Sequence, residues 1–321
     1  MKKILGIFGL LVVVFVFTAM NSENFLSAYN MQNTFRWIGL FGVIGVGVAM
    51  VIITGGIDLS IGSVIGLVGS LLALFLAKGY SPWVMVPALL VGSAGIGLFH
   101  GLLITKVRLQ PFVVTLCSLL FLRGIGRYAT ADQSVGFGQG FDILGTLAHG
   151  SIPLGGFSLP VPFISMLIVA LIAGFLLQFT IYGRYLFALG RNEEAARYSG
   201  INTDRVTIGA YVFCSLCAGF SGIVFALDLN TVQPAGMGEF YELYAIAAAV
   251  LGGCSLRGGE GSIIGVVIGT AVIIVLKNAI NILNLPSQLE FAIIGAVLLA
   301  GVIVDELVKR MVARKRAEVA G

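Results

Sequence analysis

Charged side chains are scarce in this sequence: Asp, Glu, Lys and Arg make up 11% of its 321 residues, against roughly 25% in soluble domains. A soluble chain of this length needs charge over its surface, and disordered or nucleic-acid-binding chains need even more. Hydrophobic residues make up 58% of the chain. These proportions exclude an ordinary soluble enzyme and predict an all-α, polytopic integral membrane protein.

Cysteine and histidine are also scarce. Cys214 and Cys217 have CxxC spacing, but no βαβ pattern surrounds them, so we interpret both as small buried helix residues. Neither His100 nor His149 is accompanied by carboxylates at metal-ligand spacing. We therefore predict no metal site and no catalytic residue, and we interpret His100 as a structural or pore-lining histidine.

Nucleotide-binding motifs are missing as well. No lysine stands between a glycine-rich loop and a Ser or Thr, as a phosphate-binding loop requires. The segment nearest to a dinucleotide fingerprint, Gly259–Ile264, has isoleucine where the third glycine belongs. The net charge is +4, but the basic residues do not form one stripe. We expect no cofactor on this chain and no nucleic-acid partner.

Apolar runs, in contrast, are plentiful, and a membrane-spanning helix takes about 20 residues. The first run follows Lys2 and Lys3 but lacks a small-x-small cleavage site, so we interpret it as an uncleaved span. The sequence predicts about ten spans, with a range of 8–10 because the eighth is short. In chain order they are Ile4–Met20, Trp37–Thr54, Ile61–Ala77, Val84–Thr105, Phe112–Ala129, Val161–Ile181, Val206–Leu229, Leu243–Leu256, Ser262–Ile282 and Leu289–Val304.

The basic residues predict the orientation of these spans. Lys and Arg in short loops mark the cytoplasmic side, and most of the 19 fall on one side if the N-terminus lies in the cytoplasm. Both termini are then cytoplasmic. The inner segments would carry Lys2, Lys3, Lys106, Arg108, Arg184, Arg191, Arg197, Arg205, Arg257, Lys309, Arg310, Arg314, Lys315 and Arg316.

The second and third spans are separated by a polar break that contains Gly56, Asp58 and Ser60. Non-helical backbone at membrane depth is tolerated only where protein or water surrounds it. Two interpretations of Asp58 remain open, a cap of the helix that begins near Ile61 or a substrate contact, and we favour the cap.

A related glycine pattern recurs at Gly252 and Gly253, which predicts a weak internal repeat in parallel orientation, and such broken segments mark the transport site in repeat-built transporters. Ionisable residues within spans are functional candidates by default. Glu242, together with Gln233 in the preceding outer stretch, is a candidate for a polar path. For any single one of these residues, a position at the solvated end of a span is the simpler interpretation.

Two connecting segments are long. The inner segment 182–205 contains a short soluble-looking helix from Arg191 to Tyr198, which Ser199 and Gly200 end. The outer segment 130–160 is rich in Gly and Ser, and it is interpreted either as a docking surface for an extracellular partner or as a plain connector.

Three ordered blocks resemble the permease subunits of bacterial ABC sugar importers of the ribose, xylose and galactose type. The resemblance runs over nearly the whole chain. The blocks are Gly56–Ser63, then Gly183–Tyr185 with Ala188–Gly190, Asn192–Arg197 and Ser199–Asn202, and finally Ala245–Ala248 with Val250–Gly253 and Gly259.

The resemblance implies a single transmembrane permease domain over 1–321 in the bacterial inner membrane. It also implies a second permease copy that completes the pore, a periplasmic or lipid-anchored sugar-binding protein, and a cytoplasmic ATPase that binds ATP and Mg²⁺. The segment that docks on this ATPase is expected to include Gly190, Asn192, Glu193, Glu194, Ala195, Ala196, Arg197, Gly200 and Ile201.

The third block departs from the family pattern at Cys254, Arg257 and Glu260, where threonine, a small residue and lysine or valine are more usual. These departures concern an inner turn and the details of the ATPase contact. Branched-chain amino acid permeases are the nearest alternative, followed by an ATP-independent secondary transporter or channel. The Gly-Ile-Asp-Leu-Ser sequence of the first block favours a sugar permease.

Overall fold

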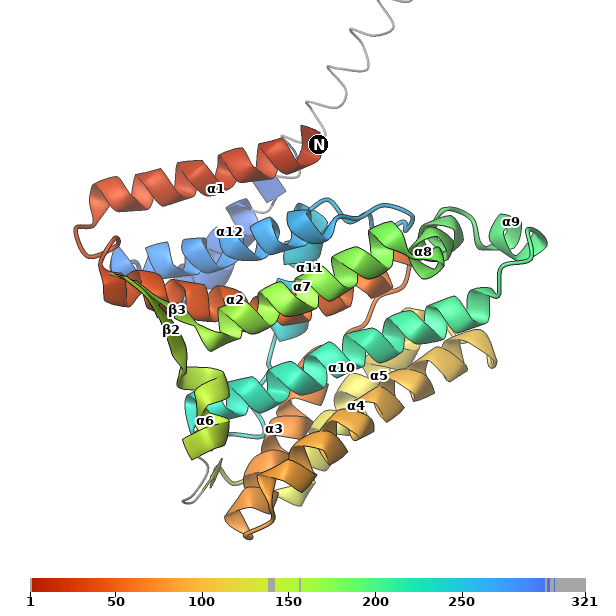
Figure 1. Ribbon diagram of the computed structural model, residues 1–321, viewed down its shortest axis with the longest axis horizontal. Helices are drawn as coiled ribbons and strands as arrows, with labels where there is room; N and C mark the ends of the chain where they lie inside the picture. Colours follow the sequence, from red (N-terminus) through yellow and green to blue (C-terminus); the bar gives the residue numbers. More distant parts are fainter. Residues whose placement is uncertain (1, 138–141, 156, 298, 301–302, 304–321) are drawn as a thin grey trace, which may run out of the picture.

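The computed structural model describes residues 2–137, 142–155, 157–297, 299–300 and 303, and these are almost entirely helical (Figure 1). The helices are α1 (Lys2–Asn21), α2 (Ala28–Ile53), α3 (Ile61–Ala77), α4 (Pro82–Thr105), α5 (Pro111–Ala129), α6 (Asp142–His149), α7 (Val161–Phe179), α8 (Ile181–Arg191), α9 (Glu193–Tyr198), α10 (Thr203–Leu229), α11 (Tyr241–Leu251) and α12 (Ile263–Ile282). The short strands are β1 (Val135–Gly136), β2 (Ser151–Leu154), β3 (Phe157–Pro160) and β4 (Thr231–Val232), and η1 covers Ser287–Leu289.

The predicted fold class, an all-α polytopic membrane protein, is confirmed. Six helices are long and apolar enough to cross a membrane, namely α2, α4, α5, α7, α10 and α12. The other four predicted spans fall on shorter apolar helices at Leu5–Asn21, Ile61–Ala77, Tyr241–Leu251 and Ser287–Val297. The end of the tenth predicted span and the basic tail residues Lys309, Arg310, Arg314, Lys315 and Arg316 lie outside the described residues.

The core is built around α2 and α10. Every residue of α2 from Ile38 to Ile53 is buried, and α10 packs against α2, α3 and α4 (Figure 1). By contrast, α4, α5 and α7 expose large apolar side chains such as Phe99, Phe121 and Phe175. In a membrane protein such a surface faces hydrocarbon, so the outer helices provide the lipid-facing layer and α2 with α10 the protein interior.

The eighth predicted span is shorter in the structure than in the sequence-based prediction. The run was expected to reach Leu256, but α11 ends at Leu251. The amides of Gly252 and Gly253 still bond to the carbonyls of Ala248 and Val250, and Gly253 then adopts a left-handed φ of 94°. Because glycine adopts this conformation without steric cost, the backbone turns out of the helix at that point.

Segment 130–160 is partly structured. Strand β1 pairs with β4, which follows α10, and β2 with β3 forms a hairpin beside α6. Near the same end, the Arg36 guanidinium lies 3.2 Å from the buried Asp228 carboxylate, and His149 Nε2 lies 3.2 Å from the carbonyl oxygen of Leu227. Figure 1 shows α6 and the hairpin at one end of the molecule and α8 with α9 at the other. We call these the hairpin end and the α9 end.

Candidate coupling site

Helix α9 is separate from α8 because Asn192 between them has an extended backbone, which ends one helix before the next begins. The Asn192 side chain accepts a hydrogen bond from the Ala195 amide at 2.9 Å and so caps the new helix. The predicted stop at Ser199 and Gly200 is confirmed, since α9 ends at Tyr198 and Gly200 adopts a φ of 84°. Ala196 is buried, whereas the Tyr198 side chain is 91% exposed.

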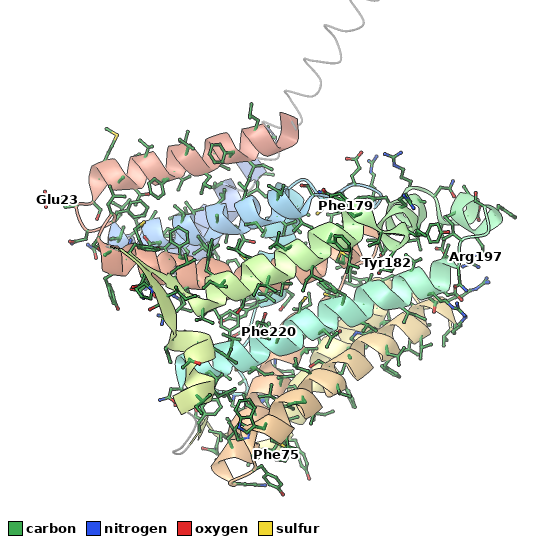
Figure 2. The ribbon with its side chains drawn as sticks, viewed as in Figure 1. Glu23, Phe75, Phe179, Tyr182, Arg197 and Phe220 are labelled. Atoms are coloured by element: carbon green, nitrogen blue, oxygen red, sulfur yellow. The ribbon has the colours of Figure 1, made fainter. Side chains whose placement is uncertain are left out.

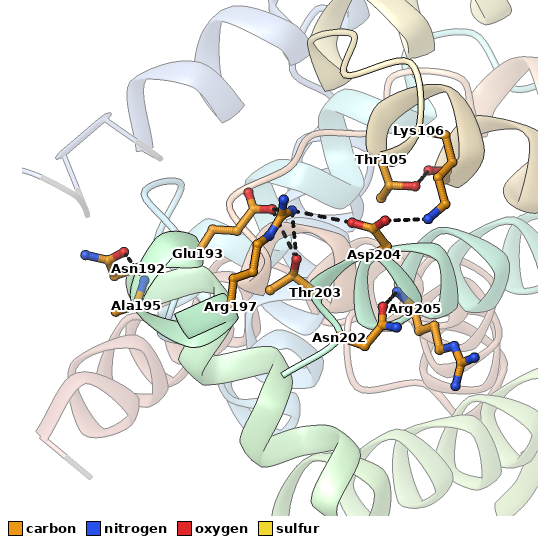
Figure 3. A network of polar contacts seen from close by, with 11 residues as sticks. Thr105, Lys106, Asn192, Glu193, Ala195, Arg197, Asn202, Thr203, Asp204 and Arg205 are labelled. Atoms are coloured by element: carbon orange, nitrogen blue, oxygen red, sulfur yellow. Dashed lines mark hydrogen bonds and ion pairs between the residues drawn. The ribbon is translucent and has the colours of Figure 1, made fainter. Parts of the chain in front are cut away.

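A polar network fixes α9 to the start of α10 (Figure 3). Arg197 contacts Glu193 one turn earlier at 2.8 Å, the Thr203 hydroxyl at 3.0 Å and the Asp204 carboxylate at 3.4 Å. Asp204 also accepts a hydrogen bond from Lys106, at the end of α4, at 2.6 Å. Asp204 therefore joins three elements, α9, α10 and the end of α4.

Four glycines bring the three sequence blocks of the resemblance together at the α9 end. Gly258 lies so close to Gly190 and Gly55 that an added Cβ would come within 2.6 Å of the Gly190 oxygen and 2.9 Å of the Gly55 nitrogen. The Gly259 amide donates a 2.8 Å hydrogen bond to the Ile53 carbonyl. We call Gly55, Gly190, Gly258 and Gly259 the glycine junction. The end of α8 thus rests directly on the break after α2 and the turn after α11.

Asp58 lies in the break between α2 and α3 and is 1% exposed. Its Oδ1 accepts hydrogen bonds from the Ser60 amide at 2.9 Å and the Ser60 hydroxyl at 2.6 Å. Its Oδ2 is buried and has no hydrogen-bond partner within the described ranges. One carboxylate oxygen thus holds the turn that starts α3.

Polar groups from three helices surround this break. The Thr115 hydroxyl of α5, which is 2.9 Å from the Pro111 carbonyl of its own helix, also lies 3.2 Å from the Ile57 carbonyl oxygen. The Tyr211 hydroxyl of α10 donates to the same Ile57 oxygen at 3.4 Å. His100 of α4 is fully buried, and its Nε2 is hydrogen-bonded to Ser118 of α5 at 2.7 Å. His100 is therefore a buried histidine with a partner 18 residues away, as expected of the structural alternative of its two predicted roles, structural or pore-lining.

Glu242, 7% exposed, lies against the glycine face of α3, where its Oε2 occupies the space that a Cβ on Gly62 would fill. The loop before it is held by Arg123 of α5, whose Nη1 donates to the carbonyls of Met237, Ala235 and Pro234, the last two at 3.3 and 3.5 Å. Gln233 is an exposed residue of the same loop. The structure thus places Glu242 beside Gly62, two residues after Ser60, and close enough to Asp58 for an electrostatic interaction, whereas Gln233 is exposed in the loop before α11.

Gly252 and Gly253 have a different environment from the other candidate path residues. A Cβ on Gly252 would come within 2.6 Å of the backbone of Gly265 and Val266 in α12. The close contact of α11 with α12 explains why position 252 is a glycine, because glycine lets the backbones of two membrane helices approach each other closely. The similar glycine patterns after α2 and α11 belong to neighbouring turns, since Gly55 contacts Arg257 and Gly258.

A cleft of about 660 Å³ opens at the α9 end beside these groups. It extends from α9 down to the break after α2 and the face of α10. Its walls include Gly55, Gly56, Arg108, Glu194 and Tyr211.

Residues 30–302 match the family model described as a permease component of branched-chain amino acid transport systems. The chain belongs to this permease family. It is 39% identical to the ribose import permease protein of Escherichia coli (strain K12), over 94% of this chain and 92% of that protein. It is 35% identical to the D-allose transport system permease protein of the same organism, over 94% and 91%. The L-arabinose permease protein is 33% identical over 93% and 90%.

No solved structure gave a significant match to the permease. The family membership makes the chain a multi-pass transport subunit, not an enzyme. Sequence reasoning had singled out the glycines of the permease, but not their meeting at one junction. The sequence gives no local signal for the carbonyl partners of Arg123, which lie more than 100 residues away.

Proposed function

We propose that this permease forms the membrane pore of an ATP-driven importer for a monosaccharide of the pentose or hexose class. The observation that carries the proposal is the nearly full-length similarity to relatives that are named for ribose, allose and arabinose. The Gly56–Ser63 block points the same way.

The proposed complex contains a cytoplasmic ATPase that binds ATP and Mg²⁺, a periplasmic or lipid-anchored sugar-binding protein and a second permease copy. The permease is one transmembrane domain over 1–321 in the bacterial inner membrane, with both termini in the cytoplasm. Lys106, Arg197 and Arg257 all lie at the α9 end. Because basic loops mark the cytoplasmic side, we assign the α9 end to the cytoplasm and the hairpin end, with segment 130–160, to the periplasm.

In the proposed mechanism the ATPase moves segment 182–205, and the glycine junction passes this movement to the helix breaks. Gly190, Asn192, Glu193, Glu194, Ala195, Ala196, Arg197, Gly200 and Ile201 form the coupling segment. Backbone contacts at the junction transmit displacement without flexible side chains, and packed interfaces switch between discrete arrangements. Gly56, Asp58, Ser60, Gln233, Glu242, Gly252 and Gly253 shape or gate the substrate path.

Substrate class is tested by uptake into cells that lack their own sugar permeases and carry this permease with its ATPase and binding protein. Radiolabelled ribose, allose and arabinose are compared with leucine. Accumulation of at least one monosaccharide and not of leucine is expected. Accumulation of leucine alone would overturn the sugar assignment and favour the branched-chain amino acid alternative.

Glu194→Arg is expected to reduce ATP-coupled uptake by at least tenfold, because charge reversal at a protein contact costs a few kcal/mol. Glu194 is exposed on α9, whereas Arg197 holds the network of Figure 3, so reversal of Glu194 leaves that network intact. The matched control is Glu23→Arg, an exposed glutamate at the opposite end of the molecule (Figure 2). Equal uptake by the two variants would contradict the docking role of α9.

Asp58→Asn separates the two interpretations of this residue. Asparagine keeps an Oδ1 that can accept both hydrogen bonds from Ser60, so we expect a normal folded yield and Tm. Asp58→Ala removes the turn contacts and should cost about 1–2 kcal/mol. If Asp58→Asn folds normally and loses uptake, the carboxylate acts in the path or gate; normal uptake would leave only the cap.

A further inference from the structure

Helix α9 is small for the task proposed for it. It has six residues, and Ala196 is the one buried in this chain. Specific protein complexes usually bury about 800 Å² on each partner, which is more than one six-residue helix presents. A stable contact with a cytoplasmic ATPase therefore needs a second element at the α9 end.

The loop between α4 and α5, residues 106–110, lies across the cleft from α9. Arg108, Leu109 and Gln110 share the cleft walls with Glu193, Glu194 and Tyr198. Leu109 is 43% exposed and its neighbour Val107 is 58% exposed. Arg108 has a φ of 60°, a left-handed conformation that is uncommon outside glycine and clusters at functional sites. The loop thus presents exposed apolar side chains next to a residue with a left-handed backbone conformation.

Asp204 connects this loop to α9. Its carboxylate binds Lys106, the first residue of the loop, and Arg197 of α9 (Figure 3). Loop and helix are therefore fixed relative to each other through one side chain at the start of α10.

We propose that the ATPase-docking surface of this permease has two elements, α9 and loop 106–110, which Asp204 holds together as one unit. The proposal rests on the proposed function and extends it to a second element. A lipid surface fits less well, because Glu193 and Glu194 in the same cleft repel anionic headgroups. The mixed charges and exposed apolar side chains suit the face of a protein partner.

Leu109→Lys tests the loop. The purified permease in nanodiscs is titrated with the purified ATPase, and the Kd of the variant is expected to rise about tenfold, as for an interface anchor. Leu285→Lys is the matched control, because Leu285 is also a loop leucine and also 43% exposed. Leu285 follows the end of α12. That end lies near the start of α2, because Asn278 of α12 is hydrogen-bonded to Asn30, and neither is among the residues that line the cleft.

The outcome distinguishes this proposal from the docking role of α9. If Glu194→Arg raises the Kd and Leu109→Lys does not, the two-element surface is overturned while the role of α9 stands. If neither variant changes the Kd, the docking role of α9 itself fails, and the two-element surface with it.

Asp204→Asn tests the connection between the two elements. Loss of both ion pairs is expected to lower the amount of sugar taken up per ATP hydrolysed at least threefold, while the folded yield stays normal. Asp132→Asn is the control, because Asp132 is an exposed carboxylate that is paired with Arg127 outside the cleft. An unchanged ratio of uptake to hydrolysis in Asp204→Asn would overturn the role of Asp204 as a positioning residue.

Discussion

Replacing Gly190 with alanine is expected to abolish coupled transport and to destabilise the permease by about 3 kcal/mol, at the upper end of the cost of overpacking. An added Cβ would overlap the Ile53 carbonyl oxygen and the Gly259 amide nitrogen. Both are backbone atoms, so no side-chain rotation relieves the overlap. These same two atoms share a hydrogen bond at the glycine junction, and a shift of either one would break it.

Gly174→Ala is the matched control for this prediction. Gly174 also lies within a helix, the apolar α7, but nothing lies within 4 Å of an added Cβ there. Alanine in a helix is favoured over glycine by up to about 1 kcal/mol, so this variant should be as stable as the wild type or more so. Thermal unfolding in detergent and ATP-coupled uptake measure both effects. Wild-type stability and uptake in Gly190→Ala would show that the close contact at the junction is not required.

Arg123→Met is expected to destabilise the permease by about 3 kcal/mol and to reduce uptake strongly. The guanidinium binds three backbone carbonyls of the loop before α11 and interacts electrostatically with the buried Glu242. Methionine fills similar volume but donates no hydrogen bond. The loop carbonyls and the carboxylate would then remain without this partner in a water-poor region, which costs more than the loss of a surface contact.

Arg127→Met, one turn later on α5, is the control. Arg127 is exposed and pairs with the exposed Asp132, and its hydrogen bonds lower the pKa of that carboxyl. Exposed ion pairs contribute little to stability, so we expect a Tm within a few degrees of the wild type. If the two arginine variants unfolded at the same temperature, Arg123 would not be the clamp that the structure indicates.

The helices of this protein could be predicted from the sequence because membrane insertion depends on composition over about 20 residues. Ten apolar runs identify ten apolar helices. The end of α11 was placed too late, since the apolar residues around Cys254 continue beyond the point where Gly253 turns the backbone. The hairpin of β2 and β3 was not predicted, although Gly155 and Gly156 stand between two short alternating runs, 151–154 and 157–160, and such a pattern is a local hairpin signal.

The candidate site could be predicted only in part. Each glycine block was visible locally, and the capped helix after Asn192 follows from short-range rules. The contact of Gly190 with Gly258 joins residues from different connecting segments, and no local pattern encodes such a contact. The same holds for Arg123, whose acceptors are main-chain oxygens that any sequence would supply.

The most direct test of the central claim, that this chain is a pore subunit driven by a separate ATPase, is uptake of radiolabelled ribose, allose or arabinose into proteoliposomes that contain the purified permease. We predict concentrative uptake only when the ATPase, the binding protein and ATP with Mg²⁺ are all present, and none with a hydrolysis-deficient ATPase. If vesicles that contain the permease alone took up sugar at the same rate as vesicles with all components, the account would be contradicted, and the chain would be an ATP-independent transporter or channel.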